Sequence, residues 1–148
     1  MCLIVDANVA GVFLARSSAI RKWLGGQTGR PRLVAAGKLK SELAMIHDVR
    51  LYLVELERAG RLRFNFSDKA LHEEENFLRK AGMCVSNDLH VLALAIVSGA
   101  RTVATRDQAL SKDFRNKAVV DSPRGSIYRD PGKHGHLLCH TSSCGVQA

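Results

Sequence analysis

Short apolar runs alternate with segments of helical spacing from residue 1 to about residue 120. Residues 3–5 are uniformly apolar and stop at a carboxylate, which is typical of a short buried strand. Residues 49–59 repeat apolar side chains three or four positions apart, which predicts an amphipathic helix. The same pattern predicts strands at residues 3–5, 32–36, 61–66, 101–105 and 117–120. It predicts helices at residues 8–15, from the Ser17-Ser18 pair to 24, at 38–46 and 49–59, after Ser67, at 88–98 and at 108–112.

Strands that alternate with helices favour an α/β fold with a central parallel β-sheet flanked by helices. The length of 148 residues and the hydrophobic content of 46% suit one domain with a single core. From Pro123 onward the composition shifts to Gly, Pro, Ser and His. We therefore expect a domain at residues 1–122 and a C-terminal extension of unassigned role at residues 123–148.

The chain is strongly basic, with 22 Lys and Arg against 14 Asp and Glu, a formal net charge of +8 and a pI of about 9.7. Among residues 1–41, which carry many of these cations, only Asp6 is acidic. Such a surface favours contact with nucleic-acid phosphates, although the same side chains also serve as an ordinary solvated face. Aromatic residues make up 5% of the chain, so base stacking is not expected to dominate recognition.

No stretch of the sequence predicts a membrane segment. Residues 91–97 form the longest apolar run, far short of the roughly 18 residues that cross a bilayer. The N-terminus reaches Asp6 without a basic leader, so we expect no signal peptide. Two of the four cysteines lie in core-like segments, which argues against a disulfide framework. A cytoplasmic protein is the expectation.

Four acidic residues carry most of the chemistry that the sequence predicts. Asp6 follows the first predicted strand and Asp107 follows the fourth, where open parallel sheets place their active sites. Glu42 and Asp88 lie in or at the start of predicted helices. Carboxylates gathered on a basic chain indicate a divalent cation and a polyanionic substrate. The alternative is that Asp6, Asp88 and Asp107 simply cap helices and that Glu42 is a surface residue.

The chain resembles the PIN domain family over residues 1 to about 120. The motifs that carry the resemblance are Leu3-Ile4-Val5-Asp6-Ala7-Asn8, Ser41-Glu42-Leu43, Asn87-Asp88 before an apolar helix, Thr105-Arg106-Asp107 and Asp113-Phe114. Each motif is weak by itself, and their order and spacing together are more specific. The segment from about Pro123 is not covered by the resemblance.

PIN domains are typically Mg²⁺- or Mn²⁺-dependent ribonucleases that act on single-stranded RNA, so the resemblance implies a PIN-like fold and this activity. It implies Asp6, Glu42, Asp88 and Asp107 as the catalytic acids. It also implies candidate helpers, namely Asn8, Thr105 and Asp113. Many bacterial members are toxins paired with an antitoxin protein, so RNA and an antitoxin are the expected partners.

Mg²⁺ binds oxygen ligands, keeps several waters and takes one or two carboxylates together with substrate phosphates. Among the four acids we expect Asp6 and Asp107 to bind the metal directly. Asp88, at a helix N-terminus, is expected to bind it through water or to orient the nucleophile. If these carboxylates converge, their mutual repulsion raises at least one pKa when no metal is bound.

Two other functions stay open from the sequence. One is a non-catalytic nucleic-acid-binding or scaffold protein on the same fold, because fold does not fix function. The other is a nucleotide-binding α/β protein, which is weakened because residues 6–11 lack the glycines of a phosphate-binding loop.

The C-terminal segment holds a dense but irregular set of zinc-binding residue types, which are His134, His136, Cys139, His140 and Cys144. Their spacing matches no standard zinc finger. We expect instead that the segment packs back on the domain or across a homodimer, driven by burial of Leu137 and Leu138.

Overall fold

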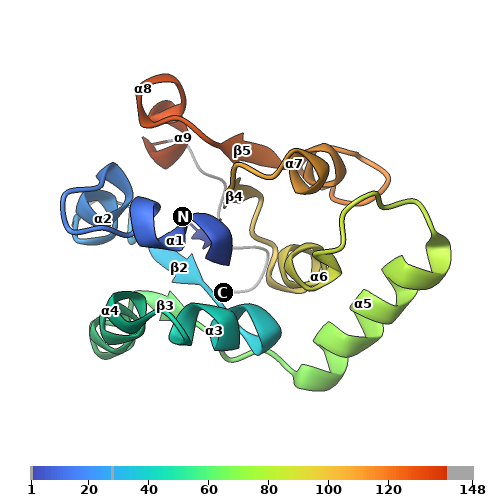
Figure 1. Ribbon diagram of the computed structural model, residues 1–148, viewed down its shortest axis with the longest axis horizontal. Coiled ribbons are helices and arrows are strands. Elements are labelled where there is room, and N and C mark those ends of the chain that lie inside the picture. The colour runs from blue at the N-terminus through green and yellow to red at the C-terminus, as the bar shows by residue number, and fades with distance from the viewer. Residues whose placement is uncertain (1, 28, 140–148) are drawn as a thin grey trace.

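The computed structural model describes residues 2–27 and 29–139, and five short strands form the centre of the described part (Figure 1). The sheet order is β3-β2-β1-β4-β5, and every neighbouring pair is parallel. The strands are β1 Cys2–Val5, β2 Arg32–Val34, β3 Leu62–Arg63, β4 Thr102–Ala104 and β5 Ser126–Tyr128. The prediction of an α/β fold with a central parallel sheet flanked by helices is confirmed.

The strand order determines where a site can form. From β1 the chain passes to β2 and then to β3 on one side, whereas β4 and β5 add to the other side. Leu3 of β1 is paired with Leu33 of β2, and Ile4 is paired with Val103 of β4. The direction of the connections therefore reverses between β1 and β4. In open parallel sheets a crevice forms at such a point, outside the carboxyl ends of the strands.

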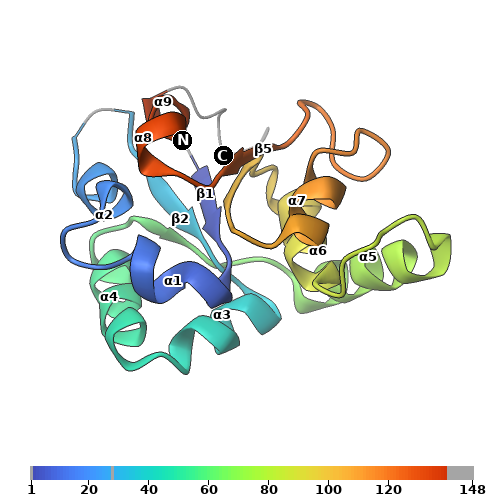
Figure 2. The same cartoon turned by 45° about the horizontal axis from the view of Figure 1, so that its top comes forward.

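Helices connect the strands, and several begin at caps that the sequence predicts. The Ser18 hydroxyl accepts from the Arg21 N–H at 3.1 Å, and the Ser67 hydroxyl accepts from the Ala70 N–H at 3.2 Å. In Figures 1 and 2, α5 projects away from the strands, with α6 between them. The helices are α1 Ala7–Phe13, α2 Ala19–Leu24, α3 Gly37–Ala44, α4 His47–Arg58, α5 Asp68–Ala81, α6 Leu89–Ser98, α7 Gln108–Phe114, α8 Pro131–His134 and α9 His136–Cys139.

The core surrounds the central strands and α6. All four residues of β1 are buried, as is most of α6, whose sequence is almost entirely apolar. Apolar runs of this kind are expected where both faces of a parallel sheet are covered. In α1, Val9 and Phe13 are buried in this core, whereas Val12 is 58% exposed.

The prediction of a last strand at residues 117–120 is wrong. Val119 and Val120 are buried, but both of their N–H groups bond to the Asn116 carbonyl, which makes a turn. The fifth strand is β5, which pairs with β4 from residue 126 to residue 128. The sheet therefore includes residues of the predicted C-terminal extension, and a boundary after residue 122 would separate β5 from its partner strand.

The segment after β5 packs against the rest of the molecule as far as the structure describes it. Leu138 is 5% exposed and belongs to the core, and Leu137 packs against that core. The His134 Nδ1 atom accepts hydrogen bonds from the N–H groups of Arg129 and Asp130, both at 3.0 Å. The expectation of docking on the domain is confirmed for these residues. His140 and Cys144 lie outside the described residues.

Cys2 and Cys84 differ in their covalent state. Cys2 is disulfide-bonded, and Cys84 is a free thiol whose pKa is raised, first by burial and then by the charge of Asp113. Within the described part of the chain, no helix combines the length and the apolar character that crossing a bilayer requires.

Candidate functional site

Asp6 and Asp107 follow the two adjacent strands β1 and β4, and Thr105 connects them. The Thr105 hydroxyl donates to Asp6 Oδ2 at 2.8 Å and accepts from the Asp107 N–H at 3.0 Å. Thr105 is fully buried and Asp6 is 4% exposed. The backbone adds a further tie, since the Asp6 N–H donates to the Ala104 carbonyl at 2.9 Å. One buried hydroxyl thus fixes the positions of both acidic residues at the switch point of the sheet.

Both of these acids also cap helices, as the alternative interpretation proposed. Asp6 Oδ1 accepts from the Asn8 N–H at 3.5 Å at the start of α1, and Asp107 Oδ1 accepts from the Leu110 N–H at 3.0 Å at the start of α7. Capping does not exclude another role, because a carboxylate has about four lone-pair positions. The candidate helper Asn8 contributes its backbone N–H to this contact, and the residue is exposed.

Asp88 differs from the other two acids. It occupies the N-cap position of α6, but its side chain makes no capping hydrogen bond, so capping does not account for it. Instead, the Asp88 N–H donates to the Ser86 hydroxyl at 2.9 Å. Among the described residues its carboxylate has no hydrogen-bond or ion-pair partner, which leaves both oxygens available to a ligand or to water.

Asp113 holds the loop that leads to Asp88. Its carboxylate is 2% exposed and accepts from the Val85 N–H at 3.0 and 3.1 Å and from the Ser86 N–H at 2.7 Å. Two backbone N–H groups, of which that of Val85 is shared by both oxygens, thus stabilise the charge of this buried carboxylate. The predicted helper therefore lies behind the loop and fixes its backbone, and through Ser86 it positions Asp88.

The three aspartates interact electrostatically. The pKa of Asp6 is raised above its ordinary value, mainly because burial removes water from the carboxylate. The hydrogen bonds from Thr105 and Asn8 oppose this rise, whereas the negative charges of Asp88 and Asp107 add to it. The direction of this shift is the one expected for converging carboxylates, although burial contributes more than repulsion.

Glu42 has a different environment. Its Oε1 atom lies 2.7 Å from Nε2 of His90, and this contact joins α3 to the first turn of α6. His90 is 8% exposed, and its Nδ1 atom is buried without a partner among the described residues. A proton on Nδ1 would have no acceptor among the described residues.

The donor chemistry of the three aspartates fits Mg²⁺ or Mn²⁺. Within residues 2–27 and 29–139, no three His, Cys, Asp or Glu side chains are grouped closely enough to enclose a metal ion. Mg²⁺ does not need such an enclosure, because it keeps waters and takes one or two carboxylates together with phosphate oxygens. Asp6 and Asp107, linked through Thr105, and the unpartnered Asp88 would supply these ligands.

Sequence reasoning missed several residues that build this site. His90 could have been noticed as a polar side chain within an otherwise apolar helix. Ser86 and Ser111 offer no comparable signal, since serine is common in loops and helix ends. Arg129, which donates to the Ser111 hydroxyl at 3.1 Å, lies in the segment that composition assigned to an extension.

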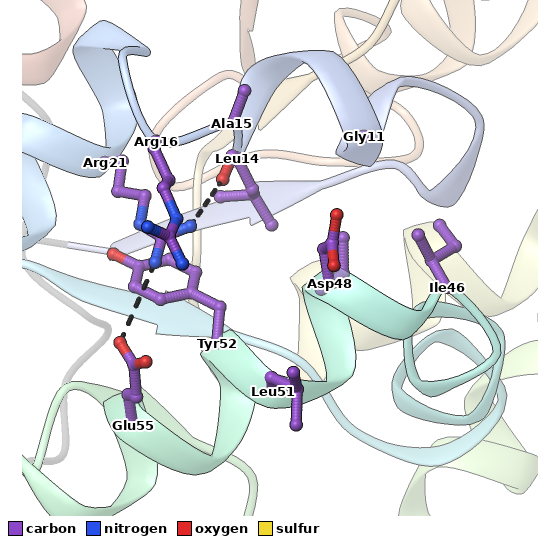
Figure 3. Close-up of a pocket in the computed structure, with 11 residues that line it drawn as sticks. Gly11, Leu14, Ala15, Arg16, Arg21, Ile46, Asp48, Leu51, Tyr52 and Glu55 are labelled. Carbon is purple, nitrogen blue, oxygen red and sulfur yellow. Dashed lines mark hydrogen bonds and ion pairs between the residues drawn. The ribbon is translucent and has the colours of Figure 1, made fainter.

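A separate hollow of about 320 Å³ lies between α1, the start of α2 and α4 (Figure 3). The Arg21 guanidinium stacks over the Tyr52 ring at 3.7 Å from its centre. It also pairs with Glu55 at 3.7 Å and donates to the Leu14 carbonyl at 3.2 Å. These contacts occupy the guanidinium, and none of the four predicted acids lines the hollow.

No protein-family model matches the chain, and no curated protein matches it. A solved structure that resembles this one is that of VapBC-1 from nontypeable Haemophilus influenzae, with 19% sequence identity and a TM-score of 0.46. The match covers 72% of this chain and 87% of the other. A likeness at this level does not identify a function.

Proposed function

We propose that this protein is a metal-dependent endoribonuclease that cleaves single-stranded RNA with Mg²⁺ or Mn²⁺. The observation that carries the proposal is geometric: the Thr105 hydroxyl ties Asp6 to Asp107 at the carboxyl ends of β1 and β4, and the Asp88 side chain caps no helix. Carboxylates are suitable ligands for a divalent cation. The net charge of +8 suits a polyanionic substrate. The PIN-like sequence motifs around the same three residues support the same activity.

The residues of the chain have distinct tasks in this proposal. Thr105 holds the Asp6 carboxylate in one orientation, and Asp6 and Asp107 would be the direct metal ligands. A bound divalent cation supplies an activated water and neutralises charge that develops on the phosphate oxygens. Asp88, whose carboxylate has no described partner, would orient the attacking water, and the loop fixed by Asp113 keeps it in place.

Glu42 takes an indirect role in this proposal. Its contact with His90 fixes the first turn of α6, and Asp88 stands two residues before His90. Glu42 would therefore act by positioning Asp88. This assignment differs from the sequence-based expectation of a fourth catalytic acid, and Glu42→Gln tests it, because the amide oxygen can still accept from His90 Nε2.

A cleavage assay tests the proposed function. Wild-type protein is incubated with single-stranded RNA in Mg²⁺, in Mn²⁺ and in EDTA, beside Asp6→Asn and the matched control Asp68→Asn. Asp68 is exposed in the first turn of α5, so its replacement changes the charge by the same amount outside the site. We expect metal-dependent cleavage by the wild type and the control, and nearly none by Asp6→Asn, because an amide is a poorer Mg²⁺ ligand.

The second candidate function is a non-catalytic nucleic-acid-binding protein. The net charge of +8 favours it, because Lys and Arg contacts to phosphates bind nucleic acid without any metal. In that case the wild type binds RNA, but no metal produces cleavage that depends on Asp6.

The expected partners are RNA, an antitoxin protein and a second copy of the chain. The antitoxin and the homodimer stay predictions that follow from the sequence resemblance and from the expected packing of the C-terminal segment. Light scattering on the purified protein measures the oligomeric state directly.

A further inference from the structure

A basic hollow of about 540 Å³ lies where the segment after β5 meets the loop before Asp107. Its lining includes Arg106, Arg129, Lys133, His134 and Asp130. In Figures 1 and 2, β5 lies between α8 and α7, so this segment stands beside the helix that Asp107 caps. Three cationic side chains therefore face one acidic side chain around the hollow.

Hydrogen bonds connect this hollow to the acidic site. Arg129 Nη2 donates to the Ser111 hydroxyl at 3.1 Å, and the Ser111 hydroxyl donates to the Asp107 carbonyl at 2.7 Å. The Asp107 N–H in turn donates to Thr105, which donates to Asp6. The backbone adds a parallel tie, because the Thr105 N–H donates to the Tyr128 carbonyl at 3.1 Å. The hollow and the acids thus share one rigid framework.

Around the hollow, hydrogen-bond donors are available to a ligand, whereas few hydrogen-bond acceptors are. The Asp130 carboxylate accepts from the Gly132 N–H at 2.8 Å and caps α8. His134 Nδ1 accepts two N–H groups, which leaves Nε2 as the donor. The Nε atom of Arg129 is buried without a partner among the described residues. A buried donor of this kind is costly unless an acceptor reaches it.

We propose that this hollow binds a phosphodiester group of the RNA strand next to the one that is cleaved, with Arg129, Lys133 and Arg106 as its cationic contacts. The inference rests on the proposed function, because it places a second phosphate of the same substrate. It also gives the C-terminal segment a role, since Arg129 and Lys133 belong to it.

Charge supports this occupant. The acids repel an RNA strand, so the neighbouring phosphate needs compensation close to them. Guanidinium groups match phosphate oxygens in geometry, and Arg129 is held in place by Ser111 before any ligand arrives. The Arg106 guanidinium lies 5.0 Å from the centre of the Phe13 ring, at the distance of a cation–π contact.

Binding of RNA without cleavage tests the proposal. A fluorescein-labelled single-stranded RNA with a 5′-hydroxyl end is titrated in EDTA over a range of salt concentrations. Arg129→Gln with Lys133→Gln removes two cations from the hollow. The double variant Arg106→Gln, Lys133→Gln also removes two cations from the hollow, and it breaks no described hydrogen bond. It therefore controls for misfolding of the first double variant. Arg115→Gln with Lys117→Gln is the control, because both of these side chains are exposed and outside the hollow.

We expect each hollow variant to bind RNA roughly 10- to 100-fold more weakly than the control pair. The slope of log K against log salt should fall in magnitude by about 0.7, because the contact with one phosphate is lost. In cleavage assays KM should rise more than kcat falls, since the contacts do not touch the reacting phosphate. Hollow variants that bind and cleave like the control pair would overturn the inference.

The outcome also separates this inference from the proposed function. RNA binding that depends on the hollow in a protein that cleaves no RNA supports the binding site and removes the nuclease function. Cleavage that depends on Asp6, but not on the hollow, leaves the function and removes the binding site. A wild type that neither binds nor cleaves RNA overturns both.

Discussion

Thr105→Val removes one buried hydroxyl and little volume. In the wild type that hydroxyl donates to Asp6 Oδ2 at 2.8 Å and accepts from the Asp107 N–H at 3.0 Å. Valine leaves the Asp6 oxygen and the Asp107 N–H without this partner. An unsatisfied buried group costs about 1–3 kcal/mol. We therefore expect the free energy of unfolding to fall by about 2–4 kcal/mol at neutral pH.

The loss of unfolding free energy in Thr105→Val should grow as the pH rises. The Thr105 hydrogen bond lowers the pKa of Asp6, so the valine variant has an Asp6 pKa that is raised further. A carboxyl whose folded pKa lies above its unfolded value stabilises the fold below the unfolded pKa and loses that contribution as pH rises. The valine variant thus loses more stability than the wild type as pH rises through the folded pKa. The difference between them should be smaller in acid than at pH 7.

Urea unfolding at several pH values measures this difference, with Thr105→Ser as the control that keeps the hydroxyl. Serine should retain most of the interaction and lose only the contribution of one methyl group. A valine variant as stable as the serine variant at pH 7 would refute the bridging role of Thr105. A valine deficit that does not shrink in acid would refute the link to Asp6.

Further substitutions test other parts of the account. In metal-free buffer Asp6→Asn should raise the free energy of unfolding by about 0.5–2 kcal/mol, because it removes a buried charge that two other charges repel. The variant should also lose less stability than the wild type as the pH rises. Urea unfolding detects either change, and a destabilised variant would contradict this reading. Asp113→Asn should cost about 1.5–3 kcal/mol, since the loop N–H groups lose a charged acceptor, and thermal unfolding should show it. Gly125→Ala should cost about 3 kcal/mol or more in the same assay, because a Cβ there would overlap the carbonyl oxygen and ring of Phe114; a loss below about 1 kcal/mol would show that this contact relaxes freely.

The sequence identifies the parts of the fold that depend on local pattern. β1, β2 and β4 are apolar runs that end at or near polar residues, and their positions follow from that pattern. Asp6 and Asp107 could be singled out because the carboxyl end of a parallel strand is a functional position whatever the strand order. That order, with β1 beside β4, involves pairing of distant segments and does not follow from periodicity.

Residues 117–120 show why an apolar pattern is ambiguous. Val119 and Val120 are buried as their pattern predicts, yet their N–H groups close a turn onto Asn116. Burial alone does not distinguish a strand from a buried turn. β5 has only three residues and follows a loop rich in polar residues, so no local pattern identifies it as a strand. It is recognised as a strand from its pairing with β4 in the folded protein.

The contacts that surround the acids are of the same long-range kind. Glu42 and His90 are 48 positions apart, and the loop bonds of Asp113 span 27 and 28 positions. Residue types alone made Glu42 and Asp113 candidates. Only the folded arrangement distinguishes the carboxylates that bind neighbouring protein groups from Asp88, whose carboxylate has no described partner.

Binding of Mn²⁺ tests the central claim most directly, because it requires the three aspartates to act as one site. Electron paramagnetic resonance of Mn²⁺ titrated with the protein reports bound and free ion. We predict that Asp6→Asn, Asp88→Asn and Asp107→Asn each weaken Mn²⁺ binding, while Asp68→Asn binds it as the wild type does. Equal binding by the wild type and Asp6→Asn would contradict the account.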